Sequence, residues 1–166
     1  MKNFFRKVAF GLKPEEKAPS DPLTWAQKQV EIIPELNWKG KYVFSEKEMR
    51  KHWIKKRVTE ETTFRKKYKN DPKGLRIAEK NLESETGAKF WPNNEICIRH
   101  AEGVRGNNPV LAKLWYFWTN HFTISDTQTL PEFSTGAYQR EFIRANMDKT
   151  FETMAIEGTI AWPMIM

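Results

Sequence analysis

A dense run of aromatic residues constrains the fold of this chain more than any other feature. Five of the eight residues from Trp115 to Phe122 are aromatic. Leu111, Trp115, Trp118 and Phe122 recur at three- or four-residue intervals after Pro109, which places them on one stripe of an α-helix. Because each ring has a large apolar area to bury, we expect a helix from Pro109 to Phe122 in the middle of the core.

The remaining helix signals predict an all-α fold, an irregular multi-helix array around the aromatic helix. Gly11 suits the left-handed end of a first helix, and Asp21-Pro22 is a typical helix start. Ser45 and Glu48 have the spacing of a capping box. Segment 35–44 predicts an irregular connection that includes at most one short extended piece. The expected helices cover 2–10, 22–33, 45–69, 72–87, 95–101 and 137–157.

Charge divides the chain into two parts within one expected domain, 1–166. Residues 1–89 hold 22 Lys and Arg against 13 Asp and Glu, whereas residues 90–166 hold 6 against 8. The first part is therefore basic and helical, and the second is aromatic and nearly neutral. A basic part attracts nucleic acid, anionic lipid or an acidic protein, and charge alone does not choose among them.

Composition and short motifs narrow the class of protein. With 39% hydrophobic and 30% charged residues, the chain resembles a globular domain, and it has no apolar run of the ~20 residues that a membrane span requires. No secretory signal peptide is visible at the start, and the single cysteine, Cys97, is compatible with a reducing compartment, so the residues by themselves indicate a cytoplasmic location. No nucleophile elbow, phosphate-binding glycine loop, paired-cysteine zinc motif or dinucleotide fingerprint is present, so no cofactor is predicted.

Two motifs in the second part resemble a known family. Trp118-Thr119-Asn120-His121-Phe122-Thr123 is followed after about a dozen residues by Tyr138-Gln139-Arg140-Glu141-Phe142-Ile143-Arg144. This pair of motifs is similar to the central signature of bacterial proteins called the domain of unknown function 1800 family. The start of the chain, Ala9-Phe10-Gly11 with Trp25 behind it, resembles the opening of the same family.

The resemblance implies a location and a partner that the residues themselves do not indicate. Members are usually several hundred residues long, so it implies that this chain is an N-terminal fragment or a truncated relative. Many relatives are thought to be exported and to be encoded beside a sulfatase-like partner family. The family has no established reaction, so the resemblance implies no substrate.

Candidate catalytic residues lie close to these motifs. His121 falls at the expected C-terminal end of the aromatic helix, Asp126 follows in the next loop, and Glu141 lies on the next helix. In a functional interpretation the three form an acid–base or metal cluster of a hydrolase-like enzyme. In a structural interpretation, which we favour, His121 caps the helix, Asp126 makes a turn and Glu141 forms surface ion pairs.

Two further groups carry weaker signals. Cys97 and His100 could share one face of a helix, but without other ligands we expect a buried cysteine beside a surface histidine. A basic run could bind nucleic acid or another anionic surface, although a solvated helix face is the more common cause of such runs. Its candidate anion-binding residues are Lys55, Lys56, Arg57, Lys66 and Lys67.

These observations favour a non-catalytic helical interaction or scaffold module over an enzyme or a nucleic-acid binder. The tail from Ile160 to Met166 is almost entirely apolar. We expect it to require cover, and we expect one apolar side of the aromatic helix to face a protein partner or a further part of a larger protein.

Overall fold

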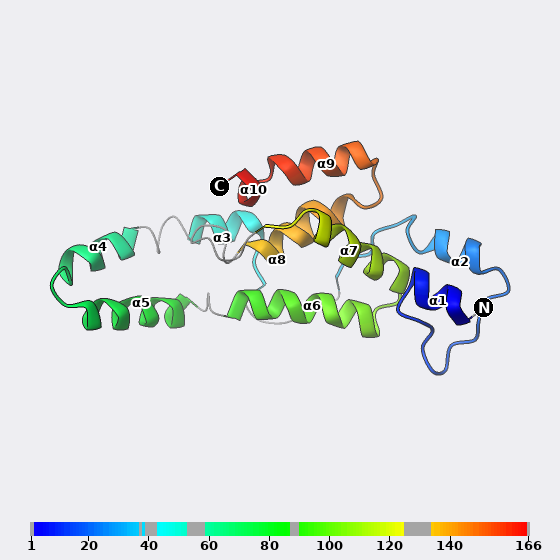
Figure 1. Ribbon diagram of the computed structural model, residues 1–166, viewed down its shortest axis with the longest axis horizontal. Coiled ribbons are helices and arrows are strands. Elements are labelled where there is room, and N and C mark those ends of the chain that lie inside the picture. The colour runs from blue at the N-terminus through cyan, green and yellow to red at the C-terminus, as the bar shows by residue number, and fades with distance from the viewer. Residues whose placement is uncertain are drawn as a thin grey trace.

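The computed structural model describes residues 2–36, 38, 43–52, 59–86, 90–124 and 134–165, and this part of the chain is all-α, without a strand (Figure 1). The π-helical turn η3 (Gln139–Ile143) and the 3-10 turn η4 (Arg144–Asn146) continue α8 without a break. No described helix combines the length and apolar character that crossing a membrane requires. The α-helices are α1 (Lys2–Val8), α2 (Pro22–Lys28), α3 (Glu46–His52), α4 (Thr59–Lys67), α5 (Pro72–Thr86), α6 (Trp91–Arg105), α7 (Pro109–His121), α8 (Thr135–Tyr138), α9 (Phe151–Ile160) and α10 (Trp162–Ile165).

Local capping explains where several helices begin. The Asp21 carboxylate accepts hydrogen bonds from the backbone N–H groups of Leu23 and Thr24 at 3.1 and 3.2 Å, which satisfies two orphan donors of α2. Ser45 and Glu48 form the expected capping box, with reciprocal bonds of 3.2 and 2.9 Å to the two backbone N–H groups. Gly11 has a φ of +104°, so the left-handed conformation expected after α1 is confirmed.

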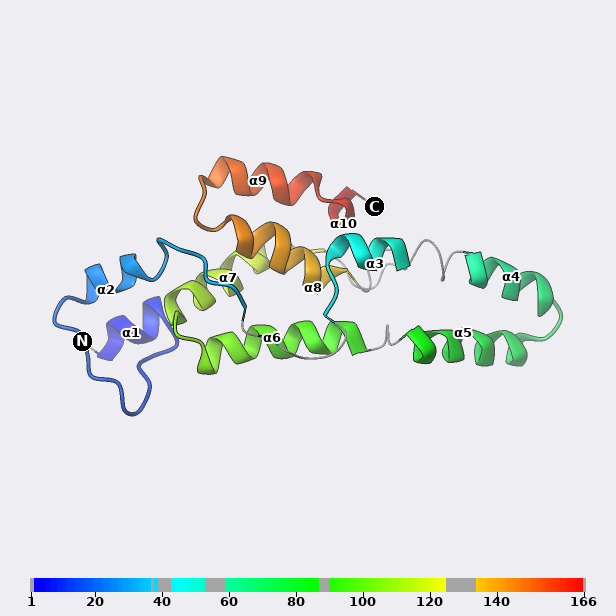
Figure 2. The ribbon, with the colours of Figure 1, turned by 180° about the vertical axis from the view of Figure 1, so that it is seen from behind.

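Helix α7 lies in the middle of the molecule, as the aromatic run predicts (Figures 1 and 2). Trp115 is buried, and its indole N–H donates to the Gln139 carbonyl at 2.8 Å, which ties α7 to η3. The Trp118 ring lies 5.5 Å from the Phe151 ring of α9. The far side of α7 is less covered, because 49% of Phe117 is exposed. The aromatic helix therefore packs chiefly through one side.

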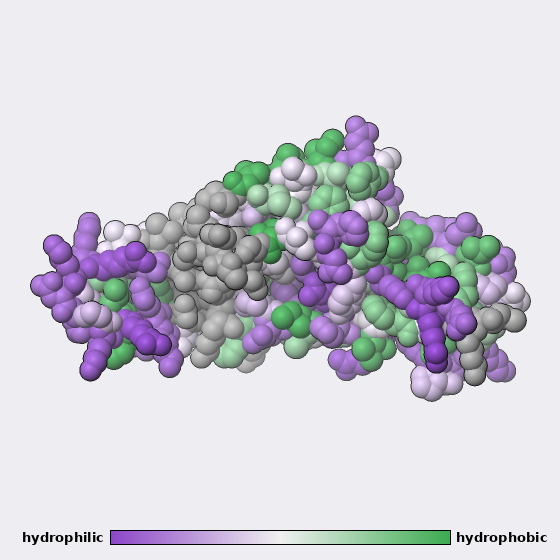
Figure 3. Space-filling model, in the orientation of Figure 1, coloured by the Kyte–Doolittle hydropathy of each residue, from purple (hydrophilic) through white to green (hydrophobic). Residues whose placement is uncertain are grey.

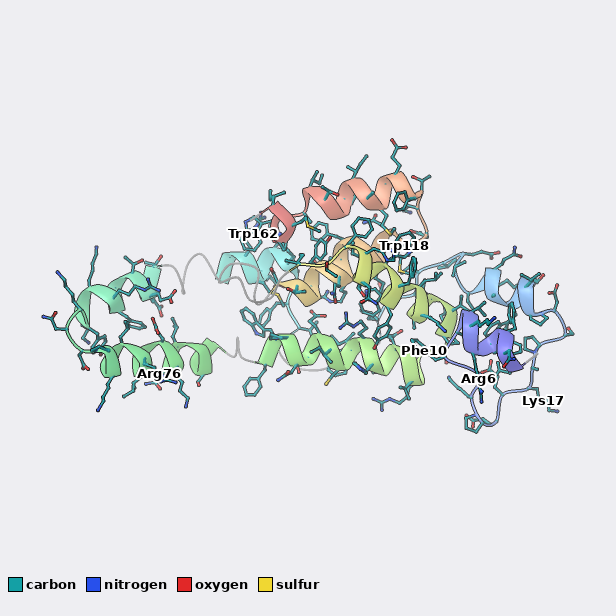
Figure 4. The ribbon with its side chains drawn as sticks, in the orientation of Figure 1. Arg6, Phe10, Lys17, Arg76, Trp118 and Trp162 are labelled. Atoms are coloured by element: carbon teal, nitrogen blue, oxygen red, sulfur yellow. The ribbon has the colours of Figure 1, made fainter. Side chains whose placement is uncertain are left out.

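Two apolar clusters lie within the core of the described part of the chain. Around η3 and α9, Trp118 and Phe122 pack against the buried Tyr138, Ile143, Met154 and Ala161. Near α3, Trp162 of α10 packs against the buried Met49, Trp91 and Ala137 (Figure 4). The apolar tail is therefore partly covered by the chain's own helices, although 67% of Ile165 is exposed.

Helices α4 and α5 form a hairpin that projects away from the body (Figures 1 and 2). The Asp71 carboxylate accepts from the Gly74 N–H at 3.0 Å and so caps the start of α5, while the Asp71 N–H donates to the Tyr68 carbonyl at 2.9 Å in the turn between the two helices. A single basic helix over 45–69 was expected. The structure shows α3 and α4 in this range, and residues 53–58 between them lie outside its described part.

Several expected helices have different bounds in the structure. The helix expected over 22–33 is α2, which ends at Lys28 and is followed by a turn at Gln29 and Val30. The helix predicted over 95–101 is α6, which runs from Trp91 to Arg105, because Pro92 is accommodated in its first turn. The last expected helical pair, 137–157, is α8 with η3 and η4, followed by α9 and α10. α8 packs directly on α6: a Cβ added to Gly136 would lie only 2.2 Å from the Cβ of Glu95. This close approach places Glu95 beside the start of η3.

Candidate functional site

An arginine at the start of η3 connects three separate parts of the chain. The Arg140 Nη2 donates to Glu95 Oε1 of α6 at 2.9 Å and to the Phe44 carbonyl at 2.7 Å. Its Nη1 donates to Glu141 Oε1 at 3.0 Å. Burial works to lower the pKa of Arg140, but hydrogen bonding and the charge of Glu95, together with Glu141, raise it. The side chain is thus a permanently charged, internal junction.

The second carboxylate oxygen of Glu141 accepts a hydrogen bond at the start of α3. Its Oε2 accepts from the backbone N–H of Glu46, the first residue of α3, at 3.1 Å. A carboxylate is favourable there, because helix N-termini carry orphan donors and a partial positive charge. Glu46 itself is buried: burial, with a smaller contribution from Glu141, raises the pKa of the Glu46 carboxyl, and Arg50 opposes the shift. Glu141 therefore acts as a structural ligand to both Arg140 and α3.

A second buried arginine follows one turn later. Arg144 lies over the Trp115 ring, with its guanidinium carbon 5.6 Å from the ring centroid, and its Nη2 donates to the Pro34 carbonyl at 2.7 Å. Burial lowers the pKa of Arg144. The Tyr138 hydroxyl donates to the Gly158 carbonyl at 3.1 Å, and burial raises the pKa of Tyr138 to about 12. Tyr138, Arg140, Glu141 and Arg144, all from one motif, therefore hold other segments in place.

His121, unlike these four residues, lies on the surface of the molecule. It is exposed, its ring lies 4.3 Å from the Phe117 ring, and its Nδ1 lies 2.9 Å from the Phe117 carbonyl. Because a carbonyl only accepts, Nδ1 carries the proton, which leaves Nε2 of the neutral ring available as a base or a ligand. The described residues show no hydrogen bond or ion pair between His121 and Glu141, and Asp126 lies outside the described residues. The proposed three-residue cluster thus stays a prediction.

The structure also corrects two local expectations. Cys97 is exposed, so the expected buried thiol is wrong: it faces outward from α6, whose buried face carries Glu95 and Ile98. Glu141 does pair with Arg140, as the structural interpretation expects, but the side chains are only 16% and 29% exposed, so the pair is partly buried and does not lie fully on the surface. Within the described ranges, no three His, Cys, Asp or Glu side chains come close enough to hold a metal ion.

The structure has a groove beside His100 that was not predicted from the sequence. It has a volume of about 480 Å³ and lies between the loop after α1 and the C-terminal part of α6. Its walls are mainly apolar, and His100, with Nδ1 2.8 Å from the Ile96 carbonyl, lies at its edge. Gly103 is the sequence signal for a close approach here, because a Cβ at this position would lie 3.3 Å from the Phe10 ring, whereas Gly11 has open space around it. Lining residues include Phe10, Leu12, Pro14, Val104 and Tyr116.

The structure describes only two of the five candidate anion-binding residues. Lys55, Lys56 and Arg57 lie outside the described residues. Lys66 and Lys67 are exposed near the tip of the α4–α5 hairpin, and Lys67 Nζ lies 5.2 Å from the centroid of the Tyr68 ring. Segment 65–76, which forms this tip, holds six Lys and Arg against one Asp.

The architecture defines an all-helical domain whose core is organised by buried arginines. Comparison with family profiles places residues 3–166 in the family described as protein of unknown function (DUF1800), so the chain belongs to this family. No curated protein and no solved structure matches the chain.

We predict that Arg140→Met lowers the free energy of unfolding by about 3–5 kcal/mol, because it leaves Glu95 buried without its cation. The double variant Arg140→Met/Glu95→Leu should recover most of that loss. Arg65→Met is the matched control, since the Arg65 side chain is 68% exposed in its pair with Glu61, one helical turn away, and its loss should cost less than about 1 kcal/mol. Urea unfolding followed by circular dichroism measures all three, and equal losses for Arg140 and Arg65 would contradict a central role of Arg140.

For His121→Ala we predict a loss of about 1 kcal/mol or less, because the ring is exposed and gives up one hydrogen bond. Thermal and urea unfolding should therefore match the unmodified chain closely, with the same helix content. A loss above about 3 kcal/mol would show that the ring is needed for folding, and it would count against a catalytic or metal-binding use.

Proposed function

We propose that this chain is a non-catalytic helical interaction module. The observation that carries the proposal is the outer face of α9. Helix α9 has apolar residues on two opposite sides, of which only one is buried, at Met154 and Gly158. On the other side, Ile156 and Ile160 are 51% and 61% exposed.

An exposed face of this kind favours an interaction role. The apolar side of a helix is normally buried against another element, and contiguous apolar surface commonly marks a binding site. Ile165 of α10, 67% exposed, adds further uncovered apolar surface near the end of α9. Figure 3 shows hydrophobic surface along α9 on the face that it draws.

A second apolar surface supports the same role. A groove of about 460 Å³ lies between α1, α2 and α7, and its polar lining is small. Val8, Val30, Leu114 and Phe117 contribute to its walls. An adaptor protein needs separate surfaces of this kind, one for each partner.

The arrangement of Glu141 supports the module over the hydrolase-like alternative. Both of its oxygens hold structural donors, Arg140 Nη1 and the Glu46 N–H. A general base needs an oxygen directed at substrate, and a metal ligand needs one directed at the metal ion. The alternative thus rests on His121 and Asp126, and Asp126 lies outside the described residues.

Binding of a polyanion is a second candidate function, favoured by the hairpin tip. Lys66, Lys69, Lys73 and Arg76 are exposed and make no ion pair with any described residue. The acidic residues of the hairpin lie mainly nearer its base, at Glu60, Glu61, Glu79, Glu83 and Glu85. The positive charge is thus concentrated at the projecting end, where phosphates would meet least repulsion.

To test the interaction module, a photoreactive benzophenone residue can replace Ile156 or Ile160 in cells that make the protein. We expect irradiation to cross-link both positions to the same partner polypeptide, identified by mass spectrometry. Ile77 of α5, which is 61% exposed on the hairpin, is the matched control position and should give no such product. Equal products from all three positions, or none from Ile156 and Ile160, would contradict the proposal.

To test polyanion binding, duplex DNA, RNA and anionic vesicles can be titrated with the chain near 50 mM salt. Six phosphate contacts predict that the affinity for DNA falls about a thousandfold between 50 and 200 mM salt. Lys66→Gln/Lys69→Gln/Lys73→Gln should weaken binding strongly, whereas the control Lys28→Gln/Lys47→Gln/Lys51→Gln, also exposed lysines, should not. No binding by any of the three anions would overturn this candidate.

A further inference from the structure

The outer face of α9 is a narrow apolar ridge. With 3.6 residues per turn, Thr153, Ile156 and Ile160 fall within about 30° of one line along the helix. This line lies opposite the buried face, where Met154 packs and where the Gly158 carbonyl accepts the Tyr138 hydroxyl. A ridge one residue wide fits the groove between side-chain rows of another helix better than it fits a flat surface.

An acidic residue flanks this ridge on each side. Glu152 and Glu157 lie about 70° to either side of the line, by the same helical geometry. Neither carboxylate forms an ion pair with a described residue, and α9 contains no Lys or Arg. The nearest cation in sequence, Lys149, lies 3.2 Å from the Asp148 carboxylate, so its charge is already matched. The face is thus an apolar strip between two unmatched negative charges.

We propose that this face binds an amphipathic helix of a partner protein whose apolar stripe has Lys or Arg on both sides. The inference rests on the proposed interaction function and specifies the partner's chemistry. Apolar side chains of the partner pack between Ile156 and Ile160. Its cations lie beside Glu152 and Glu157, as charges that flank a helix–helix seam select a partner in coiled coils.

Charge also decides against the other occupants of the same face. If two copies paired through α9, four carboxylates would surround one short apolar seam, and like charges in such positions disfavour pairing. Nucleic acid and anionic lipid are disfavoured by the same two glutamates. A basic helix is the partner for which both carboxylates make attractive contacts.

The test uses the whole 166-residue chain and three synthetic helical peptides with one shared Leu/Ile stripe. The stripe is flanked by Lys in the first peptide, by Gln in the second and by Glu in the third. Binding is measured by isothermal titration calorimetry at 50 mM and 500 mM salt. We expect the Lys-flanked peptide to bind about fivefold or more tightly than the Gln-flanked one at 50 mM salt, and the difference to shrink at 500 mM.

Variants of α9 test whether the peptides bind at this helix. Glu152→Gln/Glu157→Gln should abolish the preference for Lys while leaving the apolar contribution. Ile156→Ser/Ile160→Ser should abolish binding of all three peptides, and Ile77→Ser, a change at another exposed isoleucine, should leave binding unchanged. Circular dichroism of each variant checks that the helix content is retained.

The outcomes separate this inference from the proposed function. Equal binding of the Lys- and Gln-flanked peptides, or stronger binding of the Glu-flanked one, would overturn the basic partner and keep the interaction module. Concentration-dependent dimers that disappear in Ile156→Ser/Ile160→Ser would also replace the basic helix by a second copy. Absence of both peptide binding and self-association would overturn the inference, and absence of the α9 cross-links would then overturn the module as well.

Discussion

The fold depends on one partly buried cation, Arg140, and on the groups that its guanidinium joins. Glu95 comes from α6, Glu141 from η3, and the Phe44 carbonyl from the segment before α3. Replacing a buried ion pair with apolar residues is often neutral for stability, whereas removing one partner is costly. Arg140 therefore contributes chiefly by making one arrangement of these three segments much lower in free energy than other arrangements.

Arg140 and Arg144 also donate hydrogen bonds to backbone carbonyls that lie outside the helices. Pro34 and Phe44 lie between α2 and α3, outside any helix, so their carbonyls have no place in a hydrogen-bonded ladder. Partly buried backbone carbonyls need donors, and Arg144 and Arg140 supply them at 2.7 Å each. A planar guanidinium with five N–H groups can serve a carboxylate and a carbonyl at once, which a lysine ammonium does less precisely. Pro34 and Phe44 are thus each tied to an arginine of η3 or η4.

Local signals predicted the helices better than the contacts between them. Capping at Asp21 and Ser45, the left-handed Gly11 and the aromatic stripe of α7 depend on residues close in sequence, and all are confirmed. The bonds from Arg140 to Glu95 and to Phe44 join residues 45 and 96 positions apart, and no periodicity in the chain indicates them. For the same reason Glu141 could be predicted to form an ion pair, but its contact with the start of α3 could not.

The two exposed features of the molecule call for different partners. The α4–α5 tip is charged and offers little apolar surface at its end, whereas the α9 ridge is apolar with an acidic border. A tip of one copy on the ridge of another would match charge but would leave Ile156 and Ile160 without apolar contacts. Such a head-to-tail contact would also propagate into open chains unless its rotation closed a ring. The physical chemistry therefore favours separate ligands for the two features, with a helix on α9 and an anion at the tip.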